Sequence, residues 1–345
     1  MAGNDFEQRL AEALQPIRFF ALAHALYVVM DCGVYDTLDA ESGLGTTTIA
    51  ARHGLDAQRL QALCHYLANE GYLVEDGGWY LTGKARALAP FRPWYTLLIG
   101  GYAQTFLQLG PALQDQAPWA GRDGAKVGVG SCGISRYDAL PLADRLLDRL
   151  PGKRLVVVDL GCGDGGFLTE LAHRRPGLRG IGVEPHPASA RLAEKRVQRE
   201  GLTDRVTIHQ GRAADAVAVN LPAHDTVCFL AAFVLQEMLE QESTGAVETL
   251  LRKTIDRYPH AHWLIIEVDH QPTDRHAMAH ALGLAYYNPY FLLHAITEQR
   301  LEPAEFWNAL FQRAGLDILT LDHPTNNIDS TRLELGYLLH RSQNH

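Results

Sequence analysis

The chain has 345 residues, of which 47% are hydrophobic and 21% charged, and its formal net charge at pH 7 is -9. This length leaves room for two domains, and this composition predicts ordinary globular cores. The acidic balance argues against non-specific binding to nucleic acid, because neutralising phosphates requires an excess of lysine and arginine.

Membrane and export signals are not evident in the sequence. No apolar run reaches transmembrane length, and the first residues, MAGNDFEQRL, lack the basic and then apolar pattern of a signal peptide. The five cysteines have no CxxC spacing, which indicates reduced thiols and not a zinc finger. We therefore expect a cytoplasmic protein that does not bind membranes.

The first predicted helices lie in residues 6–30, where apolar residues recur at helical spacing and Pro16 interrupts the pattern. From Ile17 to Met30 the segment is apolar on nearly all sides, so it must be covered all round, either by its own domain or by a second subunit. We expect residues 1–95 to form a helical domain through which the protein makes a homodimer.

A winged-helix pattern lies within this domain. Residues 46–70 predict a helix–turn–helix, and the short strands 73–75 and 79–81 predict a hairpin. Winged helices often bind DNA, but the expected recognition helix carries one arginine and no lysine, too few for phosphate contacts. We favour a dimerisation domain over a DNA-binding one.

Residues 96–150 predict a helical linker that covers an active site formed by residues further along the chain. Its glycine-rich stretch GVGSCGIS is either flexible or closely packed, and Arg136 and Tyr137 follow directly. Arg136 is a candidate partner for a substrate carboxylate, which guanidinium groups bind in a bidentate manner. The alternative is an arginine in a surface loop that meets only solvent.

The segment 154–184 organises the last predicted domain, residues 151–345. An apolar run from Leu155 to Leu160, interrupted only by Asp159, is too short for a helix and predicts a parallel strand buried on both faces. The glycine-rich turn that follows lacks Cβ atoms, so its backbone can approach a ligand. A helix and a second strand that ends in Glu184 complete a βαβ unit, where this acid can accept hydrogen bonds from a ribose.

Two cofactor classes compete for this unit. Gly161, Gly163 and Gly166 satisfy the G-x-G-x-x-G spacing of nicotinamide enzymes. However, Asp164 would crowd an anionic pyrophosphate at the helix N-terminus, whereas a cationic sulfonium cofactor tolerates it. The full pattern D-L-G-C-G-D-G resembles motif I of the class I S-adenosylmethionine (SAM) methyltransferases. The cofactor-binding residues that we expect are Asp159, Gly161, Gly163, Glu184 and, on the adenine side after the third strand, Asp215.

The remaining segments predict the rest of a Rossmann-like, doubly wound α/β sheet. The fourth strand, 225–230, is followed by residues 233–237 at the mouth of the site, because ligands bind outside the carboxyl ends of such strands. A fifth strand ends near Asp269 and His270, a helical insertion spans 272–300, and two further strands close the sheet as an antiparallel pair.

This arrangement resembles the small-molecule O-methyltransferases over most of the chain. In many of those enzymes the segment after the fourth strand reads L-H-D-W, and a later histidine is the general base. Here the equivalent stretch is Leu235-Gln236-Glu237-Met238, without that histidine and tryptophan. An O-methyltransferase of a phenolic or hydroxylated secondary metabolite, which needs only a base near a hydroxyl, is therefore the alternative function.

The stretches GSCGISRYDALP, FVLQEM and YYNPYFLLHAITEQ look more like the α-keto acid C-methyltransferases, which methylate the β-carbon of phenylpyruvate, other keto acids or 2-ketoarginine. This resemblance implies an ion of iron or zinc that stabilises the enolate as a Lewis acid. His294 and Glu237 are the expected metal ligands and catalytic residues, with Gln236 as a third ligand. Members of that branch carry His-Asp where this chain has Gln236-Glu237, although a glutamate and an amide also supply oxygen ligands.

Several alternatives stay open at this point. His294 can be a structural histidine on a buried helix, and Asp269 with His270 form a reserve pair of ligands. A winged-helix transcription regulator is a third function, which the acidic charge disfavours. A substrate with a guanidinium group would need a carboxylate at the far end of its pocket, and the sequence does not show which acid that is.

Overall fold

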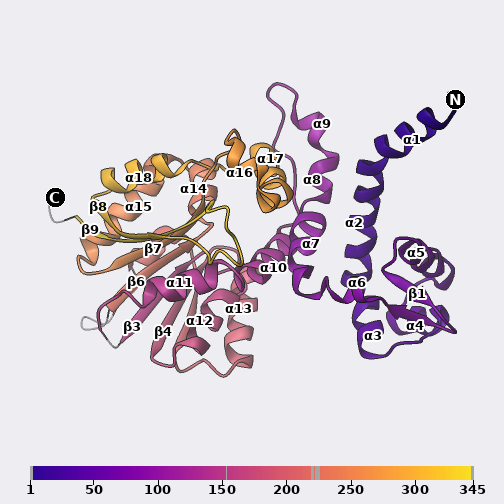
Figure 1. The fold of residues 1–345 in the computed structure, drawn as a ribbon. Helices are drawn as coiled ribbons and strands as arrows, with labels where there is room; N and C mark the ends of the chain where they lie inside the picture. The colour runs from indigo at the N-terminus through magenta and orange to yellow at the C-terminus, as the bar shows by residue number, and fades with distance from the viewer. Residues whose placement is uncertain (1–2, 153, 219–220, 222–225, 343–345) are drawn as a thin grey trace. The chain divides into compact units, whose positions relative to one another are not determined.

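A computed structural model describes residues 3–152, 154–218, 221 and 226–342 (Figure 1). The chain divides into two compact units, one of Met1–Ala103 with Arg122–Ser131 and one of Gln104–Gly121 with Cys132–His345. The segment 96–150, predicted as a linker, contributes to both units.

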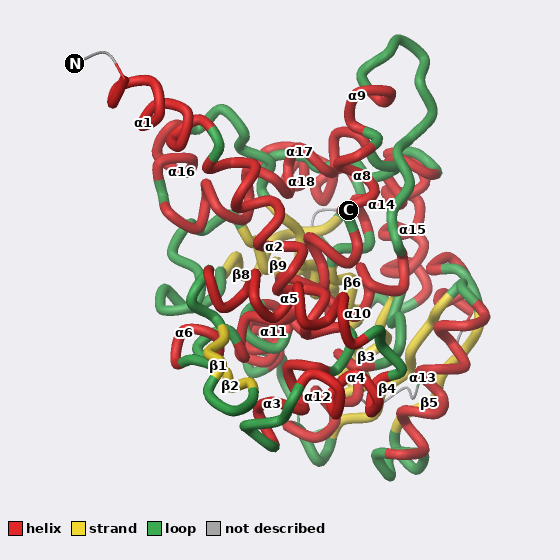
Figure 2. Tube along the Cα trace, turned by 90° about the vertical axis from the view of Figure 1, so that its right-hand side faces the viewer, coloured by secondary structure: helices red, strands yellow, loops and turns green. Residues whose placement is uncertain are grey.

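The N-terminal unit is mostly helical, with one short hairpin (Figure 2). Its helices are α1 (Gly3–Ala13), α2 (Gln15–Asp31), α3 (Val34–Ala40), α4 (Thr46–His53), α5 (Ala57–Asn69), α6 (Gly83–Arg86) and α7 (Arg92–Tyr95), with the short turns η1 (Ala89–Phe91) and η2 (Thr96–Gly101). The hairpin strands are β1 (Leu73–Glu75) and β2 (Trp79–Leu81), at the predicted positions. Trp79 anchors the hairpin to α4, because its buried indole donates to Thr46 Oγ1 at 2.8 Å.

Helix α2 has one buried and one exposed apolar side. Pro16 lies in its first turn, where a missing N–H costs nothing. Its buried residues Leu22 and Leu26 pack into the core of the unit, whereas Ile17, Phe19 and Phe20 are 65%, 57% and 49% exposed. This exposed face is what a subunit interface needs, and the dimerisation role of the unit stays a prediction.

Within the described residues, no single helix has the length and apolar character needed to cross a membrane, although the bent pair Phe6–Ala13 and Gln15–Asp31 together meets both criteria.

The C-terminal unit contains a seven-stranded mixed sheet, which confirms the predicted Rossmann-like fold. Its strands are β3 (Leu155–Leu160), β4 (Leu178–Glu184), β5 (Val206–Gln210), β6 (Thr226–Ala232), β7 (His262–Val268), β8 (Leu316–Asp322) and β9 (Glu334–Arg341). Their order is β5-β4-β3-β6-β7-β9-β8, and β9 runs antiparallel to both of its neighbours. Asp225, predicted in the fourth strand, lies outside the described residues.

Helices cover both faces of this sheet (Figure 1). On one face lie α11 (Ala139–Leu147), α12 (Gly166–Arg174) and α13 (Pro187–Arg199), and on the other lie α14 (Leu235–Gln241), α15 (Thr244–Arg257) and α18 (Ala304–Arg313). The remaining helices are α8 (Ala103–Leu107), α9 (Leu109–Ala112), α10 (Gly124–Ser135), α16 (Arg275–Ala279) and α17 (Asn288–Ile296), with the turns η3 (Ala213–Ala218) and η4 (Gly283–Tyr287). Along β3, Val157 packs toward one helical layer and Val158 toward the other, which explains why the strand is apolar throughout.

The predicted insertion packs over the carboxyl ends of the strands. Tyr287, Tyr290 and Phe291 form a small core with Val268 at the end of β7 and Leu333 just before β9. The insertion thereby places α17 beside the edge of the sheet where a ligand is expected.

Candidate functional site

The glycine-rich turn after β3 has the backbone conformation that the sequence implied. Gly161 and Gly163 have φ angles of 68° and 56°, in the left-handed region that favours glycine. A Cβ on Gly161 would lie 2.8 Å from Cγ2 of Val234, whereas a Cβ on Gly163 would meet no atom within 4 Å. The turn is therefore closed on the side of Val234 and open at Gly163, where a ligand can approach the backbone.

Glu184 connects this turn to the tip of β4. Its carboxylate accepts hydrogen bonds from the amides of Gly163 and His186, each at 2.9 Å, and the side chain is 7% exposed. A carboxylate oxygen has two lone pairs, so each oxygen can accept one more hydrogen bond. The geometry suits a ribose diol at this point.

Asp159 lies buried near the end of β3. Its Oδ2 has no hydrogen-bond partner, and burial, together with the nearby Glu184, raises the pKa of the Asp159 carboxyl to about 8. Burying an unpaired carboxyl oxygen costs free energy, so the site is suited to a ligand that donates a hydrogen bond or carries a positive charge. The ammonium group of SAM meets both requirements.

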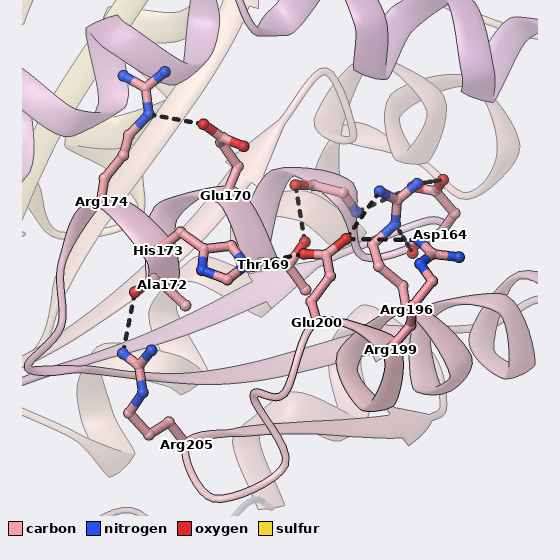
Figure 3. Close-up of polar contacts among 11 residues, drawn as sticks. Asp164, Thr169, Glu170, Ala172, His173, Arg174, Arg196, Arg199, Glu200 and Arg205 are labelled. Atoms are coloured by element: carbon pink, nitrogen blue, oxygen red, sulfur yellow. Dashed lines mark hydrogen bonds and ion pairs between the residues drawn. The ribbon is translucent and has the colours of Figure 1, made fainter.

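Asp164 is held by protein groups (Figure 3). Its Oδ1 accepts from the amide of Gly166 at 3.0 Å, and Arg196 of α13 forms an ion pair with the carboxylate. Arg196 Nε also donates to the backbone oxygen of Asp164 at 3.1 Å. Asp164 therefore stabilises the start of α12 and its contact with α13.

Asp215 is exposed in η3, after β5, and its Oδ2 accepts a hydrogen bond from the amide of Arg212 at 2.8 Å. This contact orders the turn on the side of the sheet where the adenine is expected. The cofactor role of Asp215 stays a prediction.

The chain that follows β6 is held in a strained conformation. Phe233 has a φ angle of 57°, which is unfavourable for a residue with a side chain, and its amide donates to Ile266 O at 2.8 Å. The buried Glu267 accepts from the amide of Leu235 at 3.0 Å, and burial raises the pKa of its carboxyl to about 8. These contacts fix the start of α14 and therefore the positions of the two residues that follow Leu235.

The structure brings Gln236 and His294 together around Tyr290. Gln236 Nε2 donates to the Tyr290 hydroxyl at 3.4 Å. His294 is 3% exposed, and its ring contacts the Tyr290 ring at a tilt of 34° with centroids 3.8 Å apart. His294 Nδ1 lies 2.8 Å from the backbone oxygen of Tyr290. In the neutral ring the proton is therefore on Nδ1, and Nε2 carries the lone pair that a metal or a substrate proton requires. Glu237 accepts at Oε1 from Gln299 Nε2 at 3.0 Å.

The predicted metal ligands supply a limited donor set. In the part of the chain that the structure describes, no three His, Cys, Asp or Glu side chains are grouped so that they could hold a metal ion. His294 and Glu237 offer one nitrogen and one carboxylate, and the buried Oε1 of Gln236 has no hydrogen-bond partner. The metal role of these residues stays a prediction, because an amide oxygen would have to serve as the third protein ligand.

A cavity of about 210 Å³ adjoins this cluster. Its lining residues are Trp119, Glu240, His270, Phe291, His294, Ala295, Gln299, Arg300 and Leu301. Burial lowers the pKa of His270, whose ring lies 5.0 Å from that of Phe291. Asp269 instead accepts from the amide of Ala304 at 2.9 Å and caps α18, so only His270 of the reserve pair lines the cavity.

Gln299 and Arg300 line this cavity and were not among the predicted site residues. Gln299 orients Glu237, and Arg300 is ion-paired with Glu302 at the cavity wall. Arg300 follows the predicted ligand His294 closely in the sequence. This proximity is the only feature of the sequence that could have indicated Arg300. Arg136 is exposed in the turn between α10 and α11, and its role in binding a substrate carboxylate stays a prediction.

Comparisons with known proteins identify the family of this chain. A family profile described as a methyltransferase domain matches residues 157–254. The chain is 48% identical over 340 residues to 2-ketoarginine methyltransferase from Streptomyces arginensis, and the match covers 98% of each chain.

Solved structures share the fold. The mitomycin 7-O-methyltransferase is 20% identical with a TM-score of 0.69, and the match covers 99% of this chain and 100% of that one. An O-methyltransferase from neocarzinostatin biosynthesis, solved with SAM and 2-hydroxy-5-methyl naphthoic acid, is 18% identical with a TM-score of 0.61, covering 93% and 96%.

Proposed function

Because this chain belongs to the family of SAM-dependent methyltransferases that includes 2-ketoarginine methyltransferase, we propose that it methylates the β-carbon of an α-keto acid. The observation that carries the proposal is the 48% identity, which extends over 98% of both chains. The proposed substrate is 2-ketoarginine, and phenylpyruvate is the keto acid against which its selectivity should be compared.

SAM is proposed to bind at the turn after β3. Glu184 would accept from the ribose hydroxyls, the backbone at Gly161 and Gly163 would approach the methionine part, and the unpaired Oδ2 of Asp159 would accept from its ammonium group. A positive charge beside Asp159 also favours the ionised form of this buried acid.

The substrate is proposed to lie in the cavity beside α17. The β-carbon of a keto acid becomes a nucleophile only after it loses a proton and the keto oxygen accepts the negative charge. His270 lines this cavity and stays neutral at pH 7 because burial lowers its pKa, so it is suited to take that proton. Arg136 or Arg300 would bind the carboxylate of the keto acid.

A metal ion, if bound, would be held by His294, Glu237 and Gln236 and would supply Lewis-acid stabilisation of the enolate. Hydrogen bonds within the protein position these three residues. Tyr290 orients the ring of His294, and Gln299 orients Glu237. Glu267 fixes the start of α14, which contains Gln236.

The position of the transferred methyl group tests this proposal. Purified protein is incubated with 2-ketoarginine and SAM that carries a 13C-labelled methyl group, and the product is identified by NMR. A methyl signal coupled to the β-carbon is expected. An O-methyl signal, or transfer to phenols but to no keto acid, would contradict it.

The alternative O-methyltransferase has one structural point in its favour, since the orientation of His294 also suits a general base.

The N-terminal unit is proposed to form a homodimer through the exposed face of α2. Ile17, Phe19 and Phe20 are the apolar side chains that a second copy would cover. A cytoplasmic location remains a prediction, based on five cysteines that are all free thiols.

A further inference from the structure

Three buried carboxyl groups gather at the carboxyl edge of the sheet, outside the site described above. Asp138 precedes α11, Asp329 lies in the loop before β9, and Glu334 begins β9 opposite Val268, the last residue of β7. These three residues, here called the acid cluster, are 8%, 4% and 3% exposed.

Hydrogen bonds hold the acid cluster together but leave one oxygen unpaired. The carboxyl groups of Asp138 and Glu334 are hydrogen-bonded to each other, and Asp329 accepts from the hydroxyl of Tyr287. Asp329 Oδ1 also accepts from the amide of Thr331 at 2.8 Å. The buried Oε1 of Glu334 has no hydrogen-bond partner.

Among the described residues, the charged groups that act on Asp138 and Glu334 are themselves acids. The charged neighbours that act on the pKa of Glu334 are Asp138 and Asp329, both acids, and burial together with these neighbours raises this pKa well above its ordinary value. Burial likewise raises the pKa of Asp138, to about 7. Buried acids without a cation destabilise a fold, which a protein tolerates where a ligand supplies the missing charge. The described residues offer no metal site here.

The helical stretch from Tyr287 to His294 is about as long as an arginine-like chain with a hydrogen bond at each end. Tyr287, which donates to Asp329, and His294 are seven residues apart on the continuous helical stretch of η4 and α17, so they lie on the same face about 10 Å apart along the axis. An extended chain between a keto carbon and a guanidinium carbon spans about 6 Å, and a hydrogen bond at each end adds about 3 Å.

We propose that the acid cluster binds the guanidinium group of the substrate, with the unpaired Oε1 of Glu334 as its principal acceptor. This inference rests on the proposed keto acid function and identifies the residues that select a cationic side chain. A guanidinium group presents five N–H donors in a plane, which suits several carboxylates at once. A neutral side chain would leave the buried acids uncompensated and would be discriminated against.

Discrimination between two nearly isosteric keto acids tests the acid cluster. Kinetics are compared for 2-ketoarginine and for the keto acid of citrulline, in which a neutral urea replaces the guanidinium group. Glu334→Gln should lower kcat/KM for 2-ketoarginine about 10- to 100-fold, mainly through KM, and should change the citrulline analogue little. Asp317→Asn, which removes an exposed acid of β8, is the matched control and should leave both substrates unchanged. An unchanged preference in Glu334→Gln would overturn the proposal.

A binding measurement separates this inference from the proposed function and from loss of folding. Calorimetry with 4-guanidinobutanoate, which cannot be a keto acid substrate, should detect binding to the wild type and none to Glu334→Gln or Asp138→Asn. SAM affinity measured on the same samples reports whether the variants are folded. If the wild type methylates no keto acid but binds the guanidino compound through Glu334, the proposed reaction fails and the acid cluster stands. If the wild type does not bind the compound, the acid cluster assignment fails, whatever reaction the enzyme catalyses.

Discussion

Replacing Glu184 by alanine should weaken SAM binding strongly and the fold only moderately. Glu184 accepts hydrogen bonds from the amides of Gly163 and His186, both at 2.9 Å, and its side chain is 7% exposed. In the proposed complex the same carboxylate also accepts from the ribose. The substitution therefore removes a contact to the cofactor and two contacts that shape the turn.

The size of the effect follows from these contacts. A hydrogen bond to a charged group contributes about 1.5–3 kcal/mol, and each 1.4 kcal/mol changes an equilibrium constant about tenfold. Loss of the ribose contact alone should raise the Kd for SAM about 10- to 150-fold. The freed amides of Gly163 and His186 adjoin the open side of the turn and can be hydrated, so the free energy of unfolding should fall by no more than about 3 kcal/mol.

Isothermal titration calorimetry with SAM measures the first effect, and denaturant unfolding of the protein without SAM measures the second. Glu194→Ala, an exposed glutamate on α13, is the matched control and should change neither quantity. Glu184→Gln, which keeps one acceptor oxygen, should give an intermediate Kd. Unchanged SAM affinity in a folded Glu184→Ala protein would refute the assignment of the ribose site. It would also refute the reasoning that the acid at the end of β4 binds the ribose.

Three further predictions concern the metal, the buried acid and the assembly. His294→Ala should lose any iron or zinc found in the wild type by elemental analysis and lose turnover by orders of magnitude while still binding SAM; full wild-type turnover after exhaustive chelation would exclude the metal role. The raised pKa of Asp159 means that the unfolded chain ionises this carboxyl first, so stability without SAM should fall as pH rises from about 4 to 8. In Asp159→Asn this part of the pH dependence should disappear from thermal unfolding curves; the same slope in wild type and variant would show that another group causes it. Light scattering should give a mass near twice the 38.2 kDa of the chain, and Phe19→Asp should shift it to the monomer, whereas a monomeric wild type would contradict the dimer.

Much of the fold could be predicted because it depends on short stretches of chain. The run Leu155–Leu160 predicted a doubly buried strand, and the positive φ angles of Gly161 and Gly163 match the need for residues without a Cβ. The hairpin strands 73–75 and 79–81 occur at the predicted residues. In each of these cases residues within a few positions of one another impose the conformation, since periodic burial and steric limits on φ act locally.

The sequence alone did not determine the partners of the polar side chains. It indicated His294 and Glu237 as a ligand pair, with Gln236 as a third ligand, but only the packed insertion shows that Tyr290 contacts both Gln236 and His294. Asp269, equal to His270 by position in the sequence, instead caps α18.

The acid cluster shows the same limit most clearly. A guanidinium substrate would need a carboxylate at the far end of its pocket, and the sequence does not show which of the chain's 40 acidic residues that is. Asp138 is separated by almost two hundred positions from Asp329 and Glu334, and no local pattern links them. They meet because β9 inserts antiparallel between β7 and β8 and brings its first residue to the carboxyl edge of the sheet. Local sequence fixes which residues form each strand, whereas contacts between distant strands, set by the packing of the whole domain, decide which charges are buried together.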